Sequence, residues 1–109
     1  MTTTKQVVFE GDGLVLVDKV DLSEPGEGQI QVKMVCSQIS LGTELDGLRR
    51  LRAEPDPELK AMRPGYSIAG VVTNVGPGVA GFAEGDRVMA MGAGQASHAT
   101  YCNVNQQLC

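Results

Sequence analysis

Residues 64–88 constrain the fold more than any other stretch of the chain. Residues 68–75 are rich in β-branched side chains, which predicts one extended strand. The sequence Gly-Pro-Gly at 76–78 then interrupts this strand, because glycine can adopt positive φ and proline cannot donate a ladder hydrogen bond. Phe82 follows a second turn, and a third turn at 85–86 leads back into a strand. We therefore predict a sheet that folds around a glycine-rich corner with Phe82 buried inside it.

Length and composition limit the class of protein. The chain has 109 residues, enough for one domain with a core of its own. Aromatic residues make up 4% of the chain, so we expect an aliphatic core, and 14 glycines favour a barrel or sandwich over a helical bundle. A net charge of -4 argues against nucleic acid and against an anionic membrane as partners. Because neither a signal pattern nor a membrane-length apolar run is visible, we expect a soluble, cytoplasmic protein.

The cysteines are too few and too dispersed to indicate a structural metal site. Cys36, Cys102 and Cys109 include no C-x-x-C pair, so the sequence does not support a closed zinc site of the cysteine type. We expect three free thiols in a reducing compartment.

Four further segments are predicted from patterning. Residues 6–10 and 14–20 form a predicted hairpin, and the apolar start of its second strand suggests burial of both faces. Residues 29–36 alternate as a half-buried strand does, and residues 98–104 form a predicted last strand. We expect residues 89–96 to be flexible. The apolar face of the alternating strand is predicted to carry Ile30, Val32, Met34 and Cys36.

A short helix is predicted from about residue 44 to residue 52. Thr43 is a suitable N-cap residue, and Asp46 stands where it can complete a capping box. The helix ends in a cluster of arginines, which either binds an anionic substrate or is solvated beside the helix dipole. The charged, proline-containing residues 53–63 are expected to form a surface loop that could cover a pocket. The cluster consists of Arg49, Arg50 and Arg52.

Residues 64–88 also carry a resemblance to a known family. The pattern P-G-x-x-x-A-G-V-V-x-x-V-G-x-G-V-x-G-F-x-x-G-D-R-V closely resembles the catalytic domain of medium-chain dehydrogenases/reductases, the family of zinc alcohol dehydrogenases and quinone reductases. The segments VVFEG at 7–11 and PGEGQIQVK at 25–33 are similar to the opening of the same domain. The resemblance implies a mainly β, GroES-like, partly open barrel with one or two short helices, extending over residues 1–109.

The resemblance also implies which residues form the site. Zinc-dependent members carry a ligand cysteine in a segment like S-G-I-C-G-T-D and a ligand histidine in P-G-H-E. Ser40 and Tyr66 stand at these two places here, and neutral hydroxyls are poor zinc ligands, so the resemblance is to a zinc-free branch with no metal site. Thr43 would pass a proton near the reacting carbonyl, and Tyr66 would either polarise that carbonyl or bond to backbone. The candidate catalytic residues are therefore Ser40, Thr43 and Tyr66.

The sequence offers no dinucleotide-binding residues and one isolated histidine. No G-x-G-x-x-G stands between a strand and a helix, and Gly92-Ala93-Gly94 leads into a predicted strand, so NADPH or NADH is expected only together with a Rossmann domain. His98 is the only histidine. No acidic partner can be placed beside it from the sequence, and we interpret it as structural.

Together, the residues and the resemblance imply that the chain is the substrate-binding half of a zinc-independent, NAD(P)H-linked alcohol dehydrogenase or reductase. Such an enzyme would act on a small carbonyl or alcohol substrate. We expect the chain to be inactive alone, whether it is a fragment or a free-standing domain, and to form a homo-oligomer through bare apolar surface and strand edges. The alternative is a free-standing module that binds small molecules or oligomerises without catalysis. A co-chaperonin-like subunit fits less well, because residues 53–63 are too charged for a mobile loop with an apolar tip.

Overall fold

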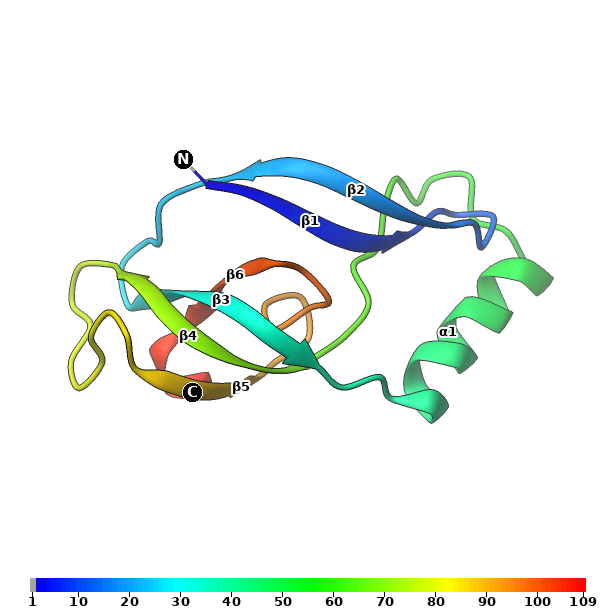
Figure 1. Ribbon diagram of the computed structural model, residues 1–109. Coiled ribbons are helices and arrows are strands. Elements are labelled where there is room, and N and C mark those ends of the chain that lie inside the picture. The colour runs from blue at the N-terminus through cyan, green and yellow to red at the C-terminus, as the bar shows by residue number, and fades with distance from the viewer. Residues whose placement is uncertain (1) are drawn as a thin grey trace.

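A computed structural model describes residues 2–109 and shows two antiparallel sheets with a helix at one end (Figure 1). Within these residues the fold is mainly β, as predicted. The two-stranded sheet consists of β1 (Thr2–Phe9) and β2 (Val15–Leu22). The four-stranded sheet has the order β5-β4-β3-β6, formed by β3 (Gln29–Ser37), β4 (Ser67–Val75), β5 (Arg87–Met91) and β6 (Tyr101–Asn105). The helices are α1 (Leu41–Ala53) and the 3₁₀ helix η1 (Gln106–Leu108).

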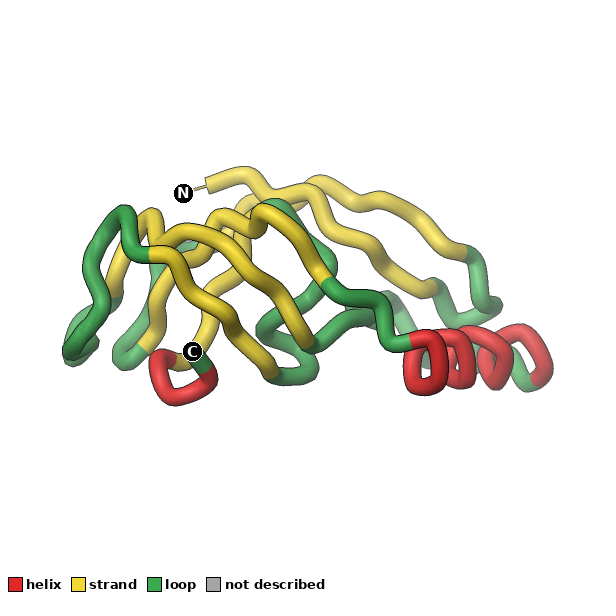
Figure 2. The backbone as a smooth tube through the Cα atoms, turned by 60° about the horizontal axis from the view of Figure 1, so that its bottom comes forward, coloured by secondary structure: helices red, strands yellow, loops and turns green. Residues whose placement is uncertain are grey.

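The helix lies where β3 ends and β4 begins. In Figures 1 and 2, α1 projects beyond this end of the sheets, whereas the turns that join β4 to β5 lie at the opposite end. Backbone hydrogen bonds join β1 to the segment before β6, since Val7 N donates to His98 O and Thr100 N donates to Lys5 O, both at 2.9 Å. The two sheets therefore hold residues 98–100 between them, beside the start of α1.

The core is aliphatic, as predicted, whereas Phe82 in the glycine-rich corner is only partly buried and not enclosed as predicted. Ile30, Val32, Val72 and Val104 are fully buried in one cluster, and Phe82 packs against it. Gly70 is required in β4 because a Cβ there would lie 2.2 Å from the carbonyl oxygen of Lys33 on β3. The predicted strand over 68–75 is confirmed, one residue longer at its start.

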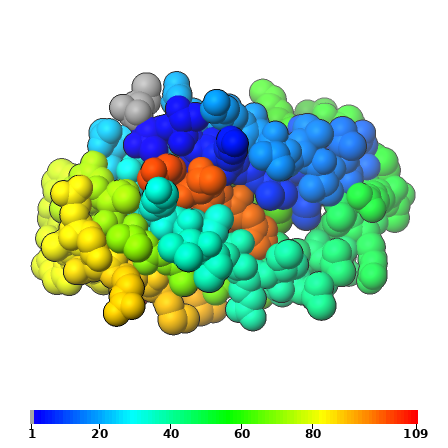
Figure 3. Space-filling view, viewed as in Figure 1, coloured from blue at the N-terminus to red at the C-terminus, as the bar shows by residue number. Residues whose placement is uncertain are grey.

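The prediction that residues 14–20 bury both faces is wrong. Val15, Leu16 and Val17 are exposed, and Val17 retains 71% of its accessible surface. The reason is that β2 pairs only with β1 in a ribbon at the surface of the molecule (Figure 3), where Val17 lines an open groove rather than a packed core. An apolar run thus indicated a strand correctly without indicating its burial.

A bulge in β3 overturns the predicted position of Cys36. Met34 pairs with Gly70 and Cys36 with Ala69, so Val35 is an extra residue in the ladder. Such an insertion reorients the side chains that follow it. Cys36 is exposed as a result and does not belong to the core, whereas Ile30 and Val32, which precede the bulge, are buried as predicted.

The helix is longer than predicted, and its cap was assigned wrongly. It begins at Leu41 with Ser40 as the N-cap residue, so Thr43 lies inside the first turn. Asp46 forms an ion pair with Arg50 at 3.1 Å and takes no part in capping. The Arg52 Nε donates to Gly13 O at 3.1 Å, which ties the helix end to the β1–β2 turn. No helix in the part of the chain that the structure describes is long and apolar enough to span a membrane.

Two boundaries near the C-terminus also differ from prediction. Strand β5 continues to Met91, so residues 89–91 are part of the sheet. Strand β6 begins only at Tyr101, so His98 lies in the segment before it, where its backbone is hydrogen-bonded to Val7 and Pro64. This displacement lets His98 take part in the site described next.

Candidate functional site

A small cavity lies between the start of α1 and the segment that precedes β4. Its volume is about 160 Å³. Thr43 and Glu44 contribute from the first turn of the helix, and Tyr66 contributes from the opposite side. The apolar part of the lining comes from Phe9 and Met62, whose backbones are joined by hydrogen bonds of 2.7 and 2.9 Å. The cavity therefore combines the exposed Thr43, the half-buried Tyr66 and the Glu44 carboxylate with a mainly apolar lining, to which the cation Arg63 also contributes.

Gly65 allows the imidazole of His98 to lie beside this cavity. Its φ is +100°, a conformation that favours glycine, and a Cβ there would lie 2.9 Å from both Cδ2 and Nε2 of His98. The backbone of His98 is tied to the same segment, since its N–H donates to Pro64 O at 3.2 Å. The glycine of the P-G-Y motif is thus explained by close packing against a ring 33 positions later in the chain.

His98 has the acidic partner that the sequence did not reveal. Its Nε2 lies 2.5 Å from Glu44 Oε1, and its Nδ1 lies 2.6 Å from Ser37 Oγ. The side chain of His98 is 11% exposed and that of Glu44 is 8% exposed. We call Ser37, His98 and Glu44 the buried array. The acidic partner that could not be placed from the sequence is thus Glu44, and the interpretation of His98 as a structural residue stays a prediction.

The second oxygen of Glu44 holds the start of the helix. Glu44 Oε2 accepts a hydrogen bond from the backbone N–H of Ser40 at 2.5 Å, while the Ser40 side chain makes no capping hydrogen bond. A carboxylate near a helix N-terminus is favoured by the helix dipole. Glu44 therefore caps α1 and binds His98 with one carboxylate. The one sequence signal for this was its position on the helix face shared with Leu48 and Leu51, where a charge would need a buried partner.

The structure brings two of the three candidate residues together. Thr43 and Tyr66 both line the cavity, whereas Ser40 does not contribute to its lining. Among residues 2–109 the Tyr66 hydroxyl makes no hydrogen bond to backbone, so that alternative is not realised. The backbone carbonyl oxygen of Tyr66, a separate group, accepts from Gly92 N at 2.8 Å. Among the same residues, no three His, Cys, Asp or Glu side chains gather as a metal site would require.

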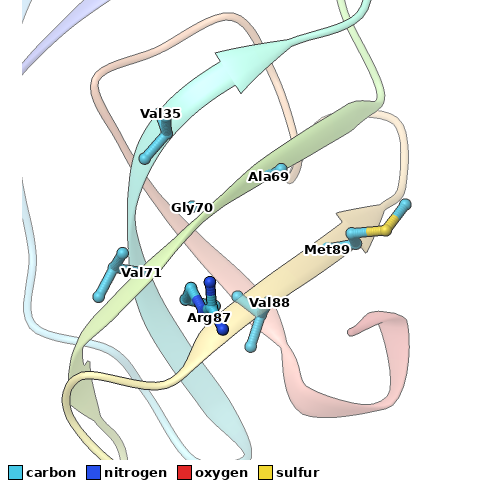
Figure 4. A pocket seen from close by; sticks show the side chains of 7 residues that line it. All are labelled: Val35, Ala69, Gly70, Val71, Arg87, Val88 and Met89. Atoms are coloured by element: carbon cyan, nitrogen blue, oxygen red, sulfur yellow. The ribbon is translucent and has the colours of Figure 1, made fainter.

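A second, larger hollow lies on the outer face of the four-stranded sheet (Figure 4). Its volume is about 520 Å³, and its lining is apolar apart from Arg87. Val35 and Met89 are the most exposed of its apolar residues, at 73% and 70%. We call this surface the outer sheet face. Its lining residues are Val35, Ala69, Gly70, Val71, Arg87, Val88 and Met89.

Comparison with known proteins identifies the family. Residues 25–109 match the family model described as the alcohol dehydrogenase GroES-like domain, so the chain belongs to this family of medium-chain dehydrogenase/reductase domains. It is 35% identical over 98 residues to an alcohol dehydrogenase from Moraxella sp. (strain TAE123), covering 88% of this chain and 28% of that protein. The predicted family and GroES-like fold are confirmed.

Solved structures show the same fold. The chain is similar to a putative zinc-dependent alcohol dehydrogenase from Rhizobium etli CFN 42, with a TM-score of 0.74, 23% identity, and coverage of 96% of this chain and 32% of that one. It is also similar to Escherichia coli quinone oxidoreductase solved in complex with NADPH, with a TM-score of 0.70, 24% identity, and coverage of 95% and 32%. The chain thus spans about a quarter to a third of the length of its relatives.

Proposed function

We propose that this chain is the substrate-binding half of a zinc-independent, NAD(P)H-linked oxidoreductase that interconverts a small carbonyl compound and its alcohol. The observation that carries the proposal is the cavity in which Thr43 and Tyr66 lie beside Glu44. Hydroxyl donors in an apolar cavity suit a ligand that has one polar oxygen on a hydrocarbon skeleton.

Each side chain has a role in this proposal. The Tyr66 hydroxyl, which has no other hydrogen-bond partner among the described residues, donates to the substrate oxygen and polarises the carbonyl. The Thr43 hydroxyl lies one residue before Glu44 and exchanges a proton with the same oxygen. Phe9 and Met62 hold the hydrocarbon part. Ser40 contributes through its backbone, because its N–H donates to Glu44 Oε2 at the start of α1 and its side chain makes no capping hydrogen bond.

The donor set supports zinc independence. Ser40 and Tyr66 supply neutral hydroxyls at the two places where zinc-dependent members carry thiolate and imidazole, and zinc prefers nitrogen and sulfur ligands. The one imidazole of the chain is already held by Glu44 and Ser37. Zinc therefore does not fit the residues present at this site.

A dinucleotide does not fit these residues either. Pyrophosphate is normally bound at a helix N-terminus that follows a glycine-rich turn. The N-terminus of α1 already holds the Glu44 carboxylate, which would repel phosphate, and Gly65 and Gly70 serve packing instead. We propose that NADH or NADPH is bound by a separate nucleotide-binding domain, and derive no step through it.

The proposal is tested by ligand binding to the chain itself. Amide spectra should be recorded during titration with cyclohexanone and, as a matched control, with methylenecyclohexane, which has nearly the same shape and no oxygen. We expect the ketone to shift the amides of residues 43–47 and 62–66 at concentrations where the hydrocarbon has a much smaller effect. Equal shifts from both compounds, or none from either, would contradict a carbonyl site.

The outer sheet face favours a second candidate function, self-association. Its exposed apolar residues include Met89, which lies on β5, an edge strand of its sheet. Exposed edges and apolar patches both promote pairing with another chain. We propose a homo-oligomer formed through this face, in a protein whose free thiols suit the cytoplasm.

A further inference from the structure

The buried array connects two separate hollows of the molecule. Glu44 lines the cavity that it shares with Thr43 and Tyr66. Ser37 and His98 line a different groove of about 260 Å³, beside the β1–β2 ribbon, together with Lys5, Val17 and Thr100. His98 lies between Glu44 and Ser37, so the array reaches from the candidate substrate cavity to a groove on its other side.

The hydrogen bonds of the array form a continuous chain of donors and acceptors. With Glu44 ionised and the ring neutral, Nε2–H donates to Glu44 Oε1, and Nδ1 accepts from the Ser37 hydroxyl. For a neutral ring this tautomer follows from the partners, because an ionised carboxylate can only accept, whereas an imidazolium would donate to both Glu44 and Ser37. Every polar group therefore has a matching partner, and the ring can pass a proton from one nitrogen while it takes one at the other.

The surrounding structure fixes the members in place. Glu44 Oε2 is held by the backbone N–H of Ser40, and the imidazole packs against Gly65, where no side chain larger than glycine's fits. Ser37 is held in the β3–β4 ladder opposite Ile68. These contacts hold the three side chains of the array in fixed relative positions, as a preorganised catalytic device has to be held.

We infer that Ser37, His98 and Glu44 relay protons between the groove and the candidate substrate cavity. The Ser37 hydroxyl gives its proton to Nδ1, Nε2 gives its proton to Glu44, and a hydronium ion in the groove returns a proton to Ser37 and is left as water. One proton has then moved to the carboxyl group, and no electrons are transferred. This inference rests on the proposed function, since carbonyl reduction leaves an oxygen that must take up one proton; its test uses no substrate.

The alternative is that the array only joins α1 to β3 as a structural contact. The two roles differ in how the ring protons exchange with water. A relay moves them through the Ser37 hydroxyl and the Glu44 carboxylate, so removing either group slows exchange. A structural contact only shields the ring, so truncation at Ser37 would open the ring to water and speed up exchange.

Because His98 is the only histidine, ¹⁵N-histidine labelling reports on this ring alone. Ring ¹⁵N shifts give the tautomer, and transfer of saturation from water gives the exchange rate of the ring N–H. We expect the Nε2–H tautomer in the wild type. We also expect exchange to slow about tenfold or more in both Ser37→Ala and Glu44→Gln, in keeping with the size of general acid–base effects.

Ser37→Thr keeps the hydroxyl and should restore the wild-type rate. Ser23→Ala, which removes an exposed serine outside the array, should leave the rate unchanged. Equal or faster exchange in Ser37→Ala would overturn the relay, and so would a wild-type ring proton that exchanges too fast to observe. If Glu44→Gln does not fold, the serine variants decide the question. Ketone binding can fail while this test succeeds, so the two proposals are refuted separately.

Discussion

The backbone of Gly65 lies directly against the imidazole of His98, and a Cβ at position 65 would lie 2.9 Å from two ring atoms and 3.0 Å from the backbone nitrogen of His98. This contact joins the segment that ends in Tyr66 to the buried array. It is therefore the point at which the fold and the candidate site depend most closely on each other.

We predict that Gly65→Ala destabilises the protein by about 2–4 kcal/mol, because the positive φ and the contact with His98 both oppose a side chain there. Urea unfolding at equilibrium measures this. Gly81→Ala is the matched control, since Gly81 has a φ of +84° and no atom near its added Cβ. The control should lose only about 1–2 kcal/mol, the cost of left-handed backbone. Equal losses in the two variants would show that packing on His98 contributes nothing.

The cysteines should differ sharply in reactivity. Cys36 is exposed after the β3 bulge, whereas Cys102 is buried and burial raises the pKa of its thiol. We predict that an aromatic disulfide reagent at mildly alkaline pH modifies Cys36 first, and reaches Cys102 only on unfolding. Partial burial also raises the pKa of Cys109, so its reaction should be slow until the pH exceeds the ordinary thiol range.

The control for this prediction is Cys36→Ser, which should remove the fast phase of thiol modification and leave the slower phases.

The burial of Cys102 also has a consequence for stability. A thiol whose pKa is raised by folding favours the folded state while protonated, so the free energy of unfolding should fall as the pH rises through the thiol range. This dependence should diminish in Cys102→Ala. Rapid modification of Cys102 in the folded protein would contradict the structure.

Parts of the fold could be predicted because their causes are local. The β-branched run in β4 and the turns after it determine a strand and a corner by themselves. The packing of Phe82 against the core follows from this corner. The exposure of Cys36 could not be predicted, because the bulge at Val35 arises only when β3 pairs with β4. The exposure of Val17 depends on the absence of a covering element, which no local pattern records.

The candidate site was predictable only in part, for a related reason. Thr43 and Tyr66 were identified from motifs, and both line the cavity. Glu44 and His98 are 54 positions apart, and nothing in the neighbourhood of either residue points to the other. Their contact depends on the early start of α1 and on the late start of β6, and both of these boundaries were placed wrongly from the sequence.

Self-association should involve the outer sheet face. We predict that sedimentation at high protein concentration shows a homodimer or larger species, and that Met89→Lys weakens it by placing a charge on apolar surface. Glu84→Lys, at an exposed position in the turn before β5, is the control for added positive charge and should associate as the wild type does. A strict monomer at every concentration would contradict this prediction.

The purified chain should contain no stoichiometric zinc. Neutral hydroxyls at Ser40 and Tyr66 leave the site without the thiolate and imidazole that zinc prefers. Elemental analysis after dialysis against buffer containing micromolar zinc is the measurement. One zinc ion per chain, retained through dialysis, would contradict the proposed zinc-independent chemistry.

The central claim is that Thr43 and Tyr66 act together on one carbonyl oxygen in the cavity beside Glu44. A double-mutant cycle tests it most directly, with cyclohexanone affinities measured for the wild type, Thr43→Val, Tyr66→Phe and the double variant. Each single change should weaken binding by about 0.5–1.5 kcal/mol, the usual net value of one hydrogen bond, and the losses should not add because the two hydroxyls share an acceptor. Unchanged affinity in all three variants would show that the cavity is not the carbonyl site.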